Sequence, residues 1–227
     1  QMCIRDRART DPSSTGSNGI SAFLVDATLD GIRVGDPPKM LGNEGSHACY
    51  VWFENCEVPA DSIVGGQEGR GLKAALRGIN HARLHVAATC VGQAIRLITE
   101  MTKYASKREQ FGKRIGEFGQ IAAMLADSRA EMAAGRALCL DCAKQFDAGD
   151  QIPFIDIASA KLFCSEMVSR VADRAVQVMG GLGYMEDLSD VPRLFRDVRL
   201  FRIFEGASQV QQGNIARSMM KDNESLS

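Results

Sequence analysis

The chain has 227 residues, enough to bury a hydrophobic core as one large domain or two small ones. Its 27 basic and 28 acidic side chains nearly cancel, which argues against a general nucleic-acid or membrane-surface binder, because such proteins carry a basic excess or stripe. No apolar run approaches the roughly 20 residues that cross a bilayer, so we expect a soluble protein.

Seven cysteines are scattered along the chain, mostly within apolar helical patterns. The odd number and the scattered spacing favour reduced intracellular thiols over a secreted disulfide scaffold. The positions are Cys3, Cys49, Cys56, Cys90, Cys139, Cys142 and Cys164.

The N-terminal part predicts a small, mainly antiparallel β segment over residues 20–65. A turn-rich stretch, TDPSSTGSNG at 10–19, precedes the short apolar run ISAFLVD at 20–26. GIRVG at 31–35 and HACYVWFENCEVP at 47–59 have the same character, and the second alternates between two faces. Residues 1–7, by contrast, show no clear period of either kind.

From about residue 70 the apolar period changes from two to between three and four, which predicts helices. Three long apolar faces run over residues 72–104, 121–146 and 157–178. The third face contains Ile157, Lys161, Cys164, Val168, Val171, Ala175 and Val178. Gly180 and Gly181 follow it and predict its C-terminal end.

Two further helices are expected near the C-terminus, a short one near 189–198 and a last one over about 206–221. Four long amphipathic helices with short connections predict a mainly α protein built around a four-helix bundle.

Two side-chain pairs resemble metal ligands by spacing. Cys139 and Cys142 form C-x-x-C, but the pair lies mid-helix on an apolar stripe without a second pair, so we interpret both as core thiols. His81 and His85 lie four apart but lack the intervening glutamate and a third ligand, which favours satisfied or solvent-facing histidines. We therefore expect no metal site.

Two glycine-rich stretches, GGQEGRG at 65–71 and MGGLGY at 179–184, could suggest nucleotide-binding loops. The first does not fit the phosphate-loop pattern, and the second follows a helix rather than a strand. As isolated patterns both indicate turns.

The stretch RIFEGASQV at 202–210 places Glu205 after apolar Ile203 and Phe204, at the start of the last expected helix. A carboxylate there has two interpretations. It can stabilise a helix start, where acidic groups are favoured, or it can act as a catalytic base.

Seven stretches, taken together, resemble the acyl-CoA dehydrogenase family, the flavoproteins that introduce an α,β double bond into acyl-CoA thioesters. They occur in the family's order and spacing over residues 8–220. They are ARTDP, DGIRVG, VWFENCEVP, KREQFGKRI, AVQVMGGLGYM, RLFRDVRLFRIFEGASQ and NIAR. EFGQIAAMLAD and FRIFEG look most like the very-long-chain branch.

The resemblance implies a C-terminal helical-bundle domain over 67–227, preceded by the second half of a small β-barrel or sandwich domain over 1–66. A complete family member also has an N-terminal helical domain and the first half of the β domain, which contains a flavin-contacting segment. Residues 1–7 stand where the family has an alternating apolar strand. One interpretation of these seven residues is foreign sequence from assembly or cloning.

The resemblance assigns Glu205 as the base that removes the α-proton, with hydride passing from Cβ to FAD. The backbone N–H of Glu205 would be one oxyanion donor and a flavin ribityl hydroxyl the other. Gly206 would leave room for the thioester. Part of the family takes its base from the residue before Arg83, where this chain has Ala82, which cannot act as a base.

The resemblance also implies the binding residues. The acyl-CoA contacts are Asn80, His81, Ala82, Arg83 and Gly206. A bundle ion pair is the alternative for Arg83, whose place on an apolar stripe requires a partner in either case. The FAD contacts are Arg108, Phe111, Gln177, Val178, Met179, Gly180, Gly181, Ala207, Ser208 and Gln209.

Because Arg108 and the segment 177–181 contact a neighbour's flavin in the family, the resemblance implies a homodimer or homotetramer. It also implies electron-transfer flavoprotein as the electron acceptor, in the bacterial cytoplasm or the mitochondrial matrix. An acyl-CoA oxidase or a flavin monooxygenase on the same scaffold remains an alternative. A non-catalytic helical assembly module is another, although it predicts loss of Glu205 or Arg108, and both are present.

Overall fold

The computed structural model describes residues 3–46, 48–149 and 154–224. Contacts between residues divide the chain into two compact units. The N-terminal unit comprises residues 1–40 and 44–80, and the helical unit comprises residues 41–43 and 81–227. Within the described ranges no helix is both long enough and apolar enough to span a bilayer.

The N-terminal unit contains two antiparallel pairs of strands. β1 (Cys3–Arg9) pairs with β2 (Ile20–Asp26), in a register that sets Arg9 opposite Ile20. β3 (Ile32–Val34) pairs with β4 (Val51–Phe53). Short 3-10 turns occur at η1 (Ser17–Gly19) and η2 (Ala60–Ser62). The strands expected at 20–26 and 31–35 are thereby confirmed.

One strand of this unit was not predicted, and one expected strand is shorter than predicted. Residues 3–9 form a strand although they lack an alternating pattern, because antiparallel pairing uses main-chain groups that every residue carries. The expected strand over 47–59 is extended only at Val51–Phe53, and His47 lies outside the described residues. Asn55, two residues after β4, adopts a left-handed backbone with φ of 50°, which interrupts the extended conformation.

The helical unit is built from long helices whose bounds follow the apolar periods. α1 (Gly71–Ala105) begins in the N-terminal unit and continues into the helical unit from His81. α2 (Gly119–Asp147) and α3 (Phe154–Met179) complete the long set. Between α1 and α2 lie a hairpin of β5 (Glu109–Gln110) and β6 (Lys113–Arg114) and the 3-10 turn η3 (Ile115–Glu117). The sequence did not predict this hairpin.

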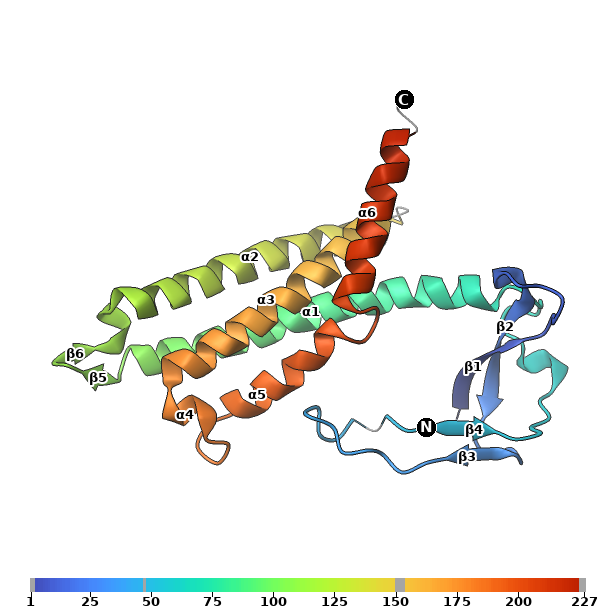
Figure 1. Cartoon of the computed structure of the whole chain (residues 1–227), viewed down its shortest axis with the longest axis horizontal. Helices are drawn as coiled ribbons and strands as arrows, with labels where there is room; N and C mark the ends of the chain where they lie inside the picture. The colour runs from blue at the N-terminus through green and yellow to red at the C-terminus, as the bar shows by residue number, and fades with distance from the viewer. Residues whose placement is uncertain (1–2, 47, 150–153, 225–227) are drawn as a thin grey trace. The chain divides into compact units, whose positions relative to one another are not determined.

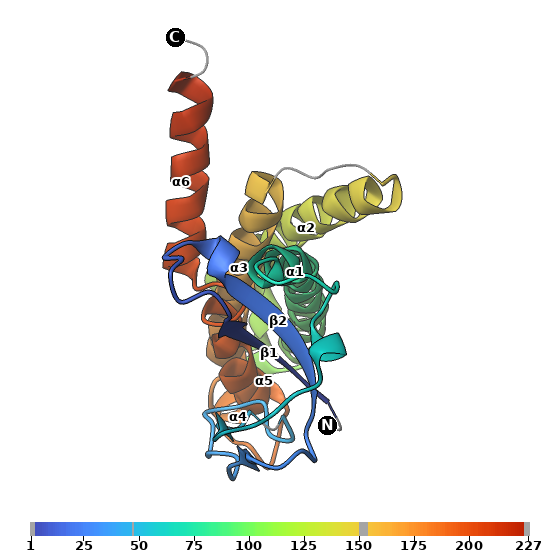
Figure 2. The same cartoon turned by 90° about the vertical axis from the view of Figure 1, so that its right-hand side faces the viewer.

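After α3, the chain forms α4 (Gly181–Tyr184), α5 (Val191–Val198), η4 (Arg199–Arg202) and α6 (Ser208–Glu224). Figures 1 and 2 show α2, α3 and α5 running along the bundle, whereas α6 crosses it steeply. The expected helices near 189–198 and 206–221 are confirmed. Gly180, at φ of 57°, ends α3 as predicted.

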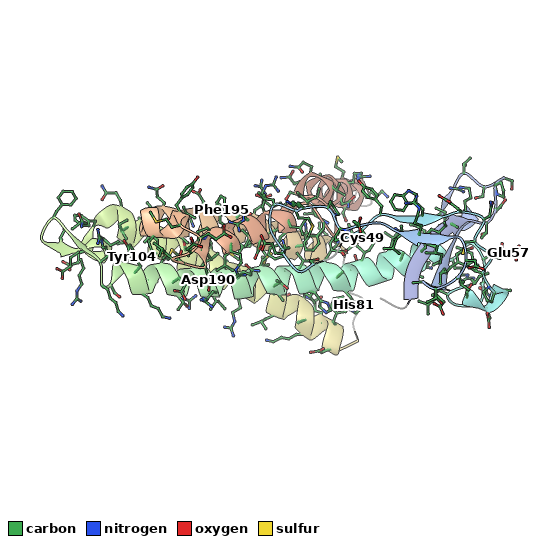
Figure 3. The ribbon with its side chains drawn as sticks, turned by 90° about the horizontal axis from the view of Figure 1, so that it is seen from below. Cys49, Glu57, His81, Tyr104, Asp190 and Phe195 are labelled. Carbon is green, nitrogen blue, oxygen red and sulfur yellow. The ribbon has the colours of Figure 1, made fainter. Side chains whose placement is uncertain are left out.

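α3 is the central helix of this unit. All seven residues of its predicted apolar face are buried, and α3 packs on α2, α5 and α6. The core around α3 includes Leu97 and Met101 of α1 and Met132 of α2. Outside this core, an ion pair of 2.9 Å joins Arg96 of α1 to Asp190 before α5, and Figure 3 shows Asp190 beside α1.

Candidate active site at the turn before the last helix

A tight turn over residues 203–207 joins η4 to α6. Glu205 and Gly206 are both left-handed, with φ of 52° and 95°. A non-glycine residue in this region is uncommon and strained, so surrounding interactions must hold it there. The Glu205 side chain is half-buried.

Two carbonyl oxygens of this turn, those of Glu205 and Gly206, accept hydrogen bonds from buried side chains. The Glu205 oxygen accepts hydrogen bonds from Arg83 Nε and Gln211 Nε2, both at 3.1 Å. The Gly206 oxygen accepts from Lys161 Nζ at 2.7 Å and from Gln211 Nε2 at 3.3 Å. Lys161 and Gln211 are fully buried, and Arg83 is nearly so.

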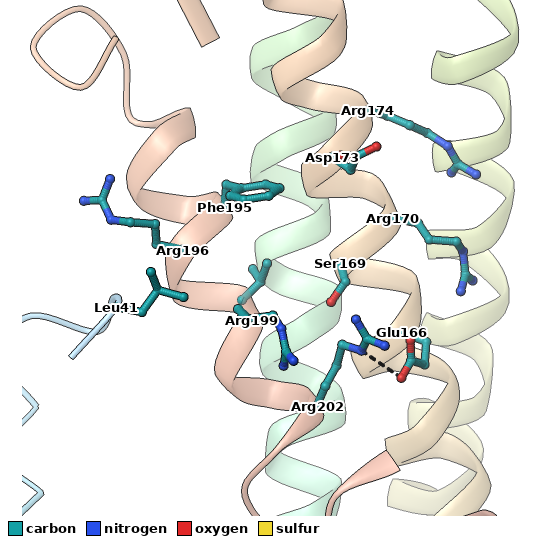
Figure 4. Close-up of a pocket in the computed structure, with 11 residues that line it drawn as sticks. Leu41, Glu166, Ser169, Arg170, Asp173, Arg174, Phe195, Arg196, Arg199 and Arg202 are labelled. Atoms are coloured by element: carbon teal, nitrogen blue, oxygen red, sulfur yellow. Dashed lines mark hydrogen bonds and ion pairs between the residues drawn. The ribbon is translucent and has the colours of Figure 1, made fainter. Parts of the chain in front are cut away.

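Both ends of the turn are tied to one carboxylate oxygen on α3. Glu166 Oε1 accepts from Arg202 Nε at 2.9 Å and from Ser208 Oγ at 2.6 Å. Figure 4 shows the first of these bonds, at the edge of a groove between α3 and α5. The turn is therefore fixed to α3 both before and after Glu205.

The charges around the turn affect one another. Burial lowers the pKa of the Arg83 guanidinium, and the nearby Glu205 carboxylate opposes that shift. Burial likewise lowers the pKa of Lys161, while Cys90, Glu166 and Glu205 act to raise it. Burial alone would raise the pKa of Glu166, but hydrogen bonds from Ser208 and Arg202 outweigh it and the net pKa is lowered.

The structure brings part of the predicted substrate set together. Arg83 lies against the Glu205–Gly206 turn, and its guanidinium also stands 5.1 Å from the Phe154 ring centroid. His81 is exposed, and its ring stacks on Phe146 of α2 at 4.5 Å, on the side of α1 visible in Figure 3.

The remaining predicted substrate residues differ in burial and in the unit to which they belong. Ala82 is half-buried beside Arg83, whereas Asn80 is the last residue of the N-terminal unit. An added Cβ on Gly206 would lie 2.3 Å from Gln211 Nε2. Glycine at this position therefore leaves room for the buried Gln211 amide.

The predicted cofactor residues fall into two separate groups. Ala207 precedes α6 next to Glu205, Ser208 and Gln209 begin the helix, and the Ser208 hydroxyl proton is already donated to Glu166. The other group lies at the far end of the unit, on the β5–β6 hairpin and the end of α3 (Figure 1). At 1.5 Å per helical residue, Gly180 is about 20 Å along the α3 direction from Glu166.

Within that far group, exposure differs from residue to residue. Arg108, Gln177, Gly180 and Gly181 are exposed, and Phe111 is 92% exposed with φ of 53°. Val178 and Met179, by contrast, are buried in the core of the unit. The side chains of these two residues therefore serve packing.

Three residues that organise the turn were not singled out as site residues from the sequence: Lys161, Glu166 and Gln211. Lys161 had a visible signal, because a lysine on an otherwise apolar helix face must find a partner when buried. Glu166 and Gln211 carry no such signal, since polar residues at their positions are ordinary on a helix.

The cysteine pair and the histidine pair lie where the sequence suggested, in the core and at the surface respectively. Cys139 and Cys142 are buried in the core, and the Cys139 sulfur lies 3.6 Å from that of Cys164. His81 and His85 both face solvent. In the part of the chain that the structure describes, no group of three or more His, Cys, Asp or Glu side chains could hold a metal ion.

Residues 69–220 match a family model described as the C-terminal domain of acyl-CoA dehydrogenase. Over 215 residues the chain is 37% identical to "Probable acyl-CoA dehydrogenase FadE25" of Mycobacterium tuberculosis, covering 94% of this chain and 54% of that protein. It is 36% identical to the mitochondrial very long-chain specific acyl-CoA dehydrogenase of Mus musculus, covering 84% of this chain and 29% of that protein.

A solved structure is also similar. Butyryl-CoA dehydrogenase from Megasphaera elsdenii has a TM-score of 0.90 and 32% identity to this chain, covering 96% of this chain and 56% of that one. The chain thus spans about half the length of the curated M. tuberculosis relative.

Proposed function

Because the chain belongs to the acyl-CoA dehydrogenase family, we propose that it forms the C-terminal part of an FAD-dependent enzyme that oxidises acyl-CoA thioesters to their α,β-unsaturated products, in fatty-acid or related acyl-CoA catabolism. One observation carries the proposal. Glu205 lies in a left-handed turn whose backbone is held by buried donors. The backbone position from which its carboxylate reaches a substrate is therefore fixed.

Glu205 is proposed to take the proton from Cα of the thioester, and its backbone N–H to donate to the thioester carbonyl oxygen. A proton next to a thioester is weakly acidic, so its removal requires a base held at Cα and a donor held at the developing oxyanion. Arg83, close beside the turn, is proposed to contact the acyl-CoA together with Asn80, His81, Ala82 and Gly206. Ala82 itself offers no carboxylate at the alternative base position.

The residues at the far end of the helical unit fit an FAD. Phe111 has an exposed ring, and Arg108 has an exposed side chain. The space beside the Gly180 backbone is empty, since an added Cβ would meet no atom within 4 Å. A guanidinium suits paired phosphate oxygens and an aromatic ring suits a planar heterocycle. Bound FAD would supply the hydride acceptor for Cβ.

Around Glu205, Ala207, Ser208 and Gln209 are proposed to approach the flavin from the first turn of α6, with Ser208 using its backbone N–H. The set on the hairpin and at Gln177–Gly181 lies at the other end of the helical unit, and in the family the matching residues contact a neighbour's flavin. We therefore propose a homodimer or homotetramer in which that set serves the neighbouring subunit, with electron-transfer flavoprotein as the acceptor, in the bacterial cytoplasm or mitochondrial matrix.

The test uses the full-length flavoprotein mixed anaerobically with a panel of acyl-CoA thioesters. Wild type should bleach its flavin with at least one of them. Glu205→Gln should keep its flavin but reduce it at least roughly a thousandfold more slowly, the scale expected for loss of a general base. Glu57→Gln, on an exposed loop residue labelled in Figure 3, is the matched control and should behave as wild type.

Two results would contradict the proposal. Near-normal flavin reduction in Glu205→Gln would remove this residue as the base. Rapid hydrogen peroxide formation when the reduced enzyme meets air would replace the dehydrogenase with an acyl-CoA oxidase.

A further inference from the structure

The complete burial of the Lys161 side chain is energetically unfavourable, and the proposed chemistry does not explain it. This side chain is fully buried in an apolar helix face, and burial lowers its pKa. Removing an ammonium group from water destabilises the folded chain unless nearby groups compensate for the lost hydration. Lys161 Nζ donates to a backbone carbonyl, that of Gly206, at 2.7 Å. The buried ammonium group of Lys161 therefore holds the peptide group that carries the Gly206 carbonyl.

Gln211 is likewise a fully buried polar side chain that donates to the backbone of the turn. Its Nε2 donates to the carbonyl oxygens of both Glu205 and Gly206, whereas its Oε1 has no hydrogen-bond partner among the described residues. Turning the amide over would set Oε1 against two carbonyl oxygens, so these contacts fix its orientation. A buried amide that leaves its acceptor unmatched destabilises the folded chain. The gain at the turn must outweigh that cost.

The conformation of the turn explains the need for these donors. Two successive left-handed residues direct both carbonyls inward, and the peptide bonds of the described turn are trans. In a planar trans peptide the N–H points opposite to the C=O. Inward carbonyls therefore direct the N–H groups of Gly206 and Ala207 away from the buried donors. Without those donors the two carbonyls of this half-buried turn would lose their hydrogen-bond partners, and the turn would relax.

Arg83 completes the arrangement from a third helix by donating to the Glu205 oxygen. The three donors come from α1, α3 and α6, and they converge on two adjacent peptide groups. Position 206 must remain glycine for the same reason, because a Cβ would displace the Gln211 amide.

We propose that Lys161 and Gln211 are positioning residues: together they hold the Glu205–Gly206 turn in the conformation from which the Glu205 carboxylate removes the α-proton. This inference rests on the proposed function. Neither residue need touch substrate or flavin, because each acts through the backbone of the turn. Loss of either donor should slow proton removal while leaving substrate binding nearly unchanged.

The experiment compares Lys161→Met and Gln211→Met with wild type in the full-length flavoprotein. Methionine nearly matches both side chains in volume and removes the donors. Val171→Ala is the control, since Val171 is equally buried on α3 but packs in the core away from the turn. It should lower stability without changing the turn.

Two independent readouts are used. Amide hydrogen exchange, followed by mass spectrometry on the peptide that covers residues 203–208, should be about tenfold or more faster in both methionine variants and unchanged in Val171→Ala. Loss of Cα deuterium from a labelled acyl-CoA should slow roughly ten- to a hundredfold in the methionine variants. In this step the Cα–D bond breaks, the deuteron passes to the Glu205 carboxylate, and a solvent proton returns to Cα. The half-saturating acyl-CoA concentration should change less than about threefold.

Unchanged amide exchange at 203–208 would overturn the inference whatever the activity. Faster amide exchange with normal loss of Cα deuterium would also overturn it, because the turn would then be held without serving the base. A wild-type enzyme that exchanges no Cα deuterium with any acyl-CoA would instead count against the proposed function, while the amide exchange still decides whether Lys161 and Gln211 hold the turn.

Discussion

The hydroxyl of Ser208 donates a hydrogen bond of 2.6 Å to Oε1 of Glu166, 42 residues earlier in the chain. The same carboxylate oxygen accepts Arg202 Nε at 2.9 Å. One side chain of α3 thus anchors the residues on either side of the turn that carries Glu205. The stability of this turn should depend on the ionisation of Glu166.

Glu166→Gln tests that dependence on pH. The folded-state pKa of Glu166 lies below its ordinary value of 4.5. The ionised carboxylate therefore contributes stability that is fully present above about pH 4.5 and is lost as the pH falls through the folded-state pKa. The urea midpoint of wild type should exceed that of Glu166→Gln at pH 6.5, and the difference should shrink below pH 4.5.

A pH-independent difference between the two proteins would contradict this account. Glu131→Gln is the matched control, because Arg174 and Arg170 hold Glu131 by similar bonds to α3 and its pKa is also lowered. Glu131→Gln should reproduce the pH trend in stability. It should leave amide exchange at 203–208 unchanged, whereas Glu166→Gln should accelerate it.

Gly206→Ala should destabilise the protein and disturb the turn. The backbone φ of 95° is strained for any L side chain, and the new Cβ would collide with the Gln211 amide. We expect a loss of about 1–3 kcal/mol in the free energy of unfolding, measured by urea denaturation. Gly92→Ala, mid-helix in α1 with no atom within 4 Å of its Cβ position, should instead be neutral or stabilising by up to about 1 kcal/mol. Equal effects in the two variants would refute the collision.

Gly135→Val tests the close packing of α2 on α3. A Cβ at Gly135 would already lie 3.1 Å from Cys164 Sγ and 3.3 Å from Met167 Cε, and valine adds two methyl groups. Overpacking of this kind costs about 1–3 kcal/mol. Ala134→Val, on the exposed side of the same helix turn, controls for placing a β-branched side chain in this helix. Thermal unfolding that shifts equally in both variants would show that the helices do not approach closely at Gly135.

Phe111→Ala tests the proposed cofactor contact made by the hairpin. Because the ring is almost fully exposed in the single chain, its loss should leave the stability of the helical unit nearly unchanged. In the proposed full-length oligomer, loss of an aromatic contact worth about 1 kcal/mol should weaken FAD binding roughly five- to tenfold, measured by fluorescence titration of the apoprotein. Leu188→Ala, also at an exposed apolar residue, should retain normal FAD affinity. Normal FAD affinity in Phe111→Ala would remove this residue from the cofactor set.

The helices of this protein were predictable because their information is local. The repeat of apolar residues over 157–178 gave the buried face of α3 residue by residue, and Gly180 marked its end because glycine readily adopts positive φ. The strand at Cys3–Arg9 was not predictable, since its side chains do not alternate and its pairing is made by main-chain groups. The short β5–β6 hairpin was likewise hidden within a charged stretch.

The candidate site divides in the same way. The sequence by itself determined that Glu205 and Gly206 stand at the start of the last helix, and motif resemblance identified Glu205 as the expected base. Only the tertiary structure decided how that turn is held. Its donors lie at Arg83, Lys161 and Gln211, up to 122 residues from Glu205, and they meet because three helices pack together. A glutamine at position 211 looks ordinary in sequence, and Lys161 on its apolar helix face shows only that it needs some partner, since the direction of a backbone carbonyl is a property of the folded chain and leaves no local pattern.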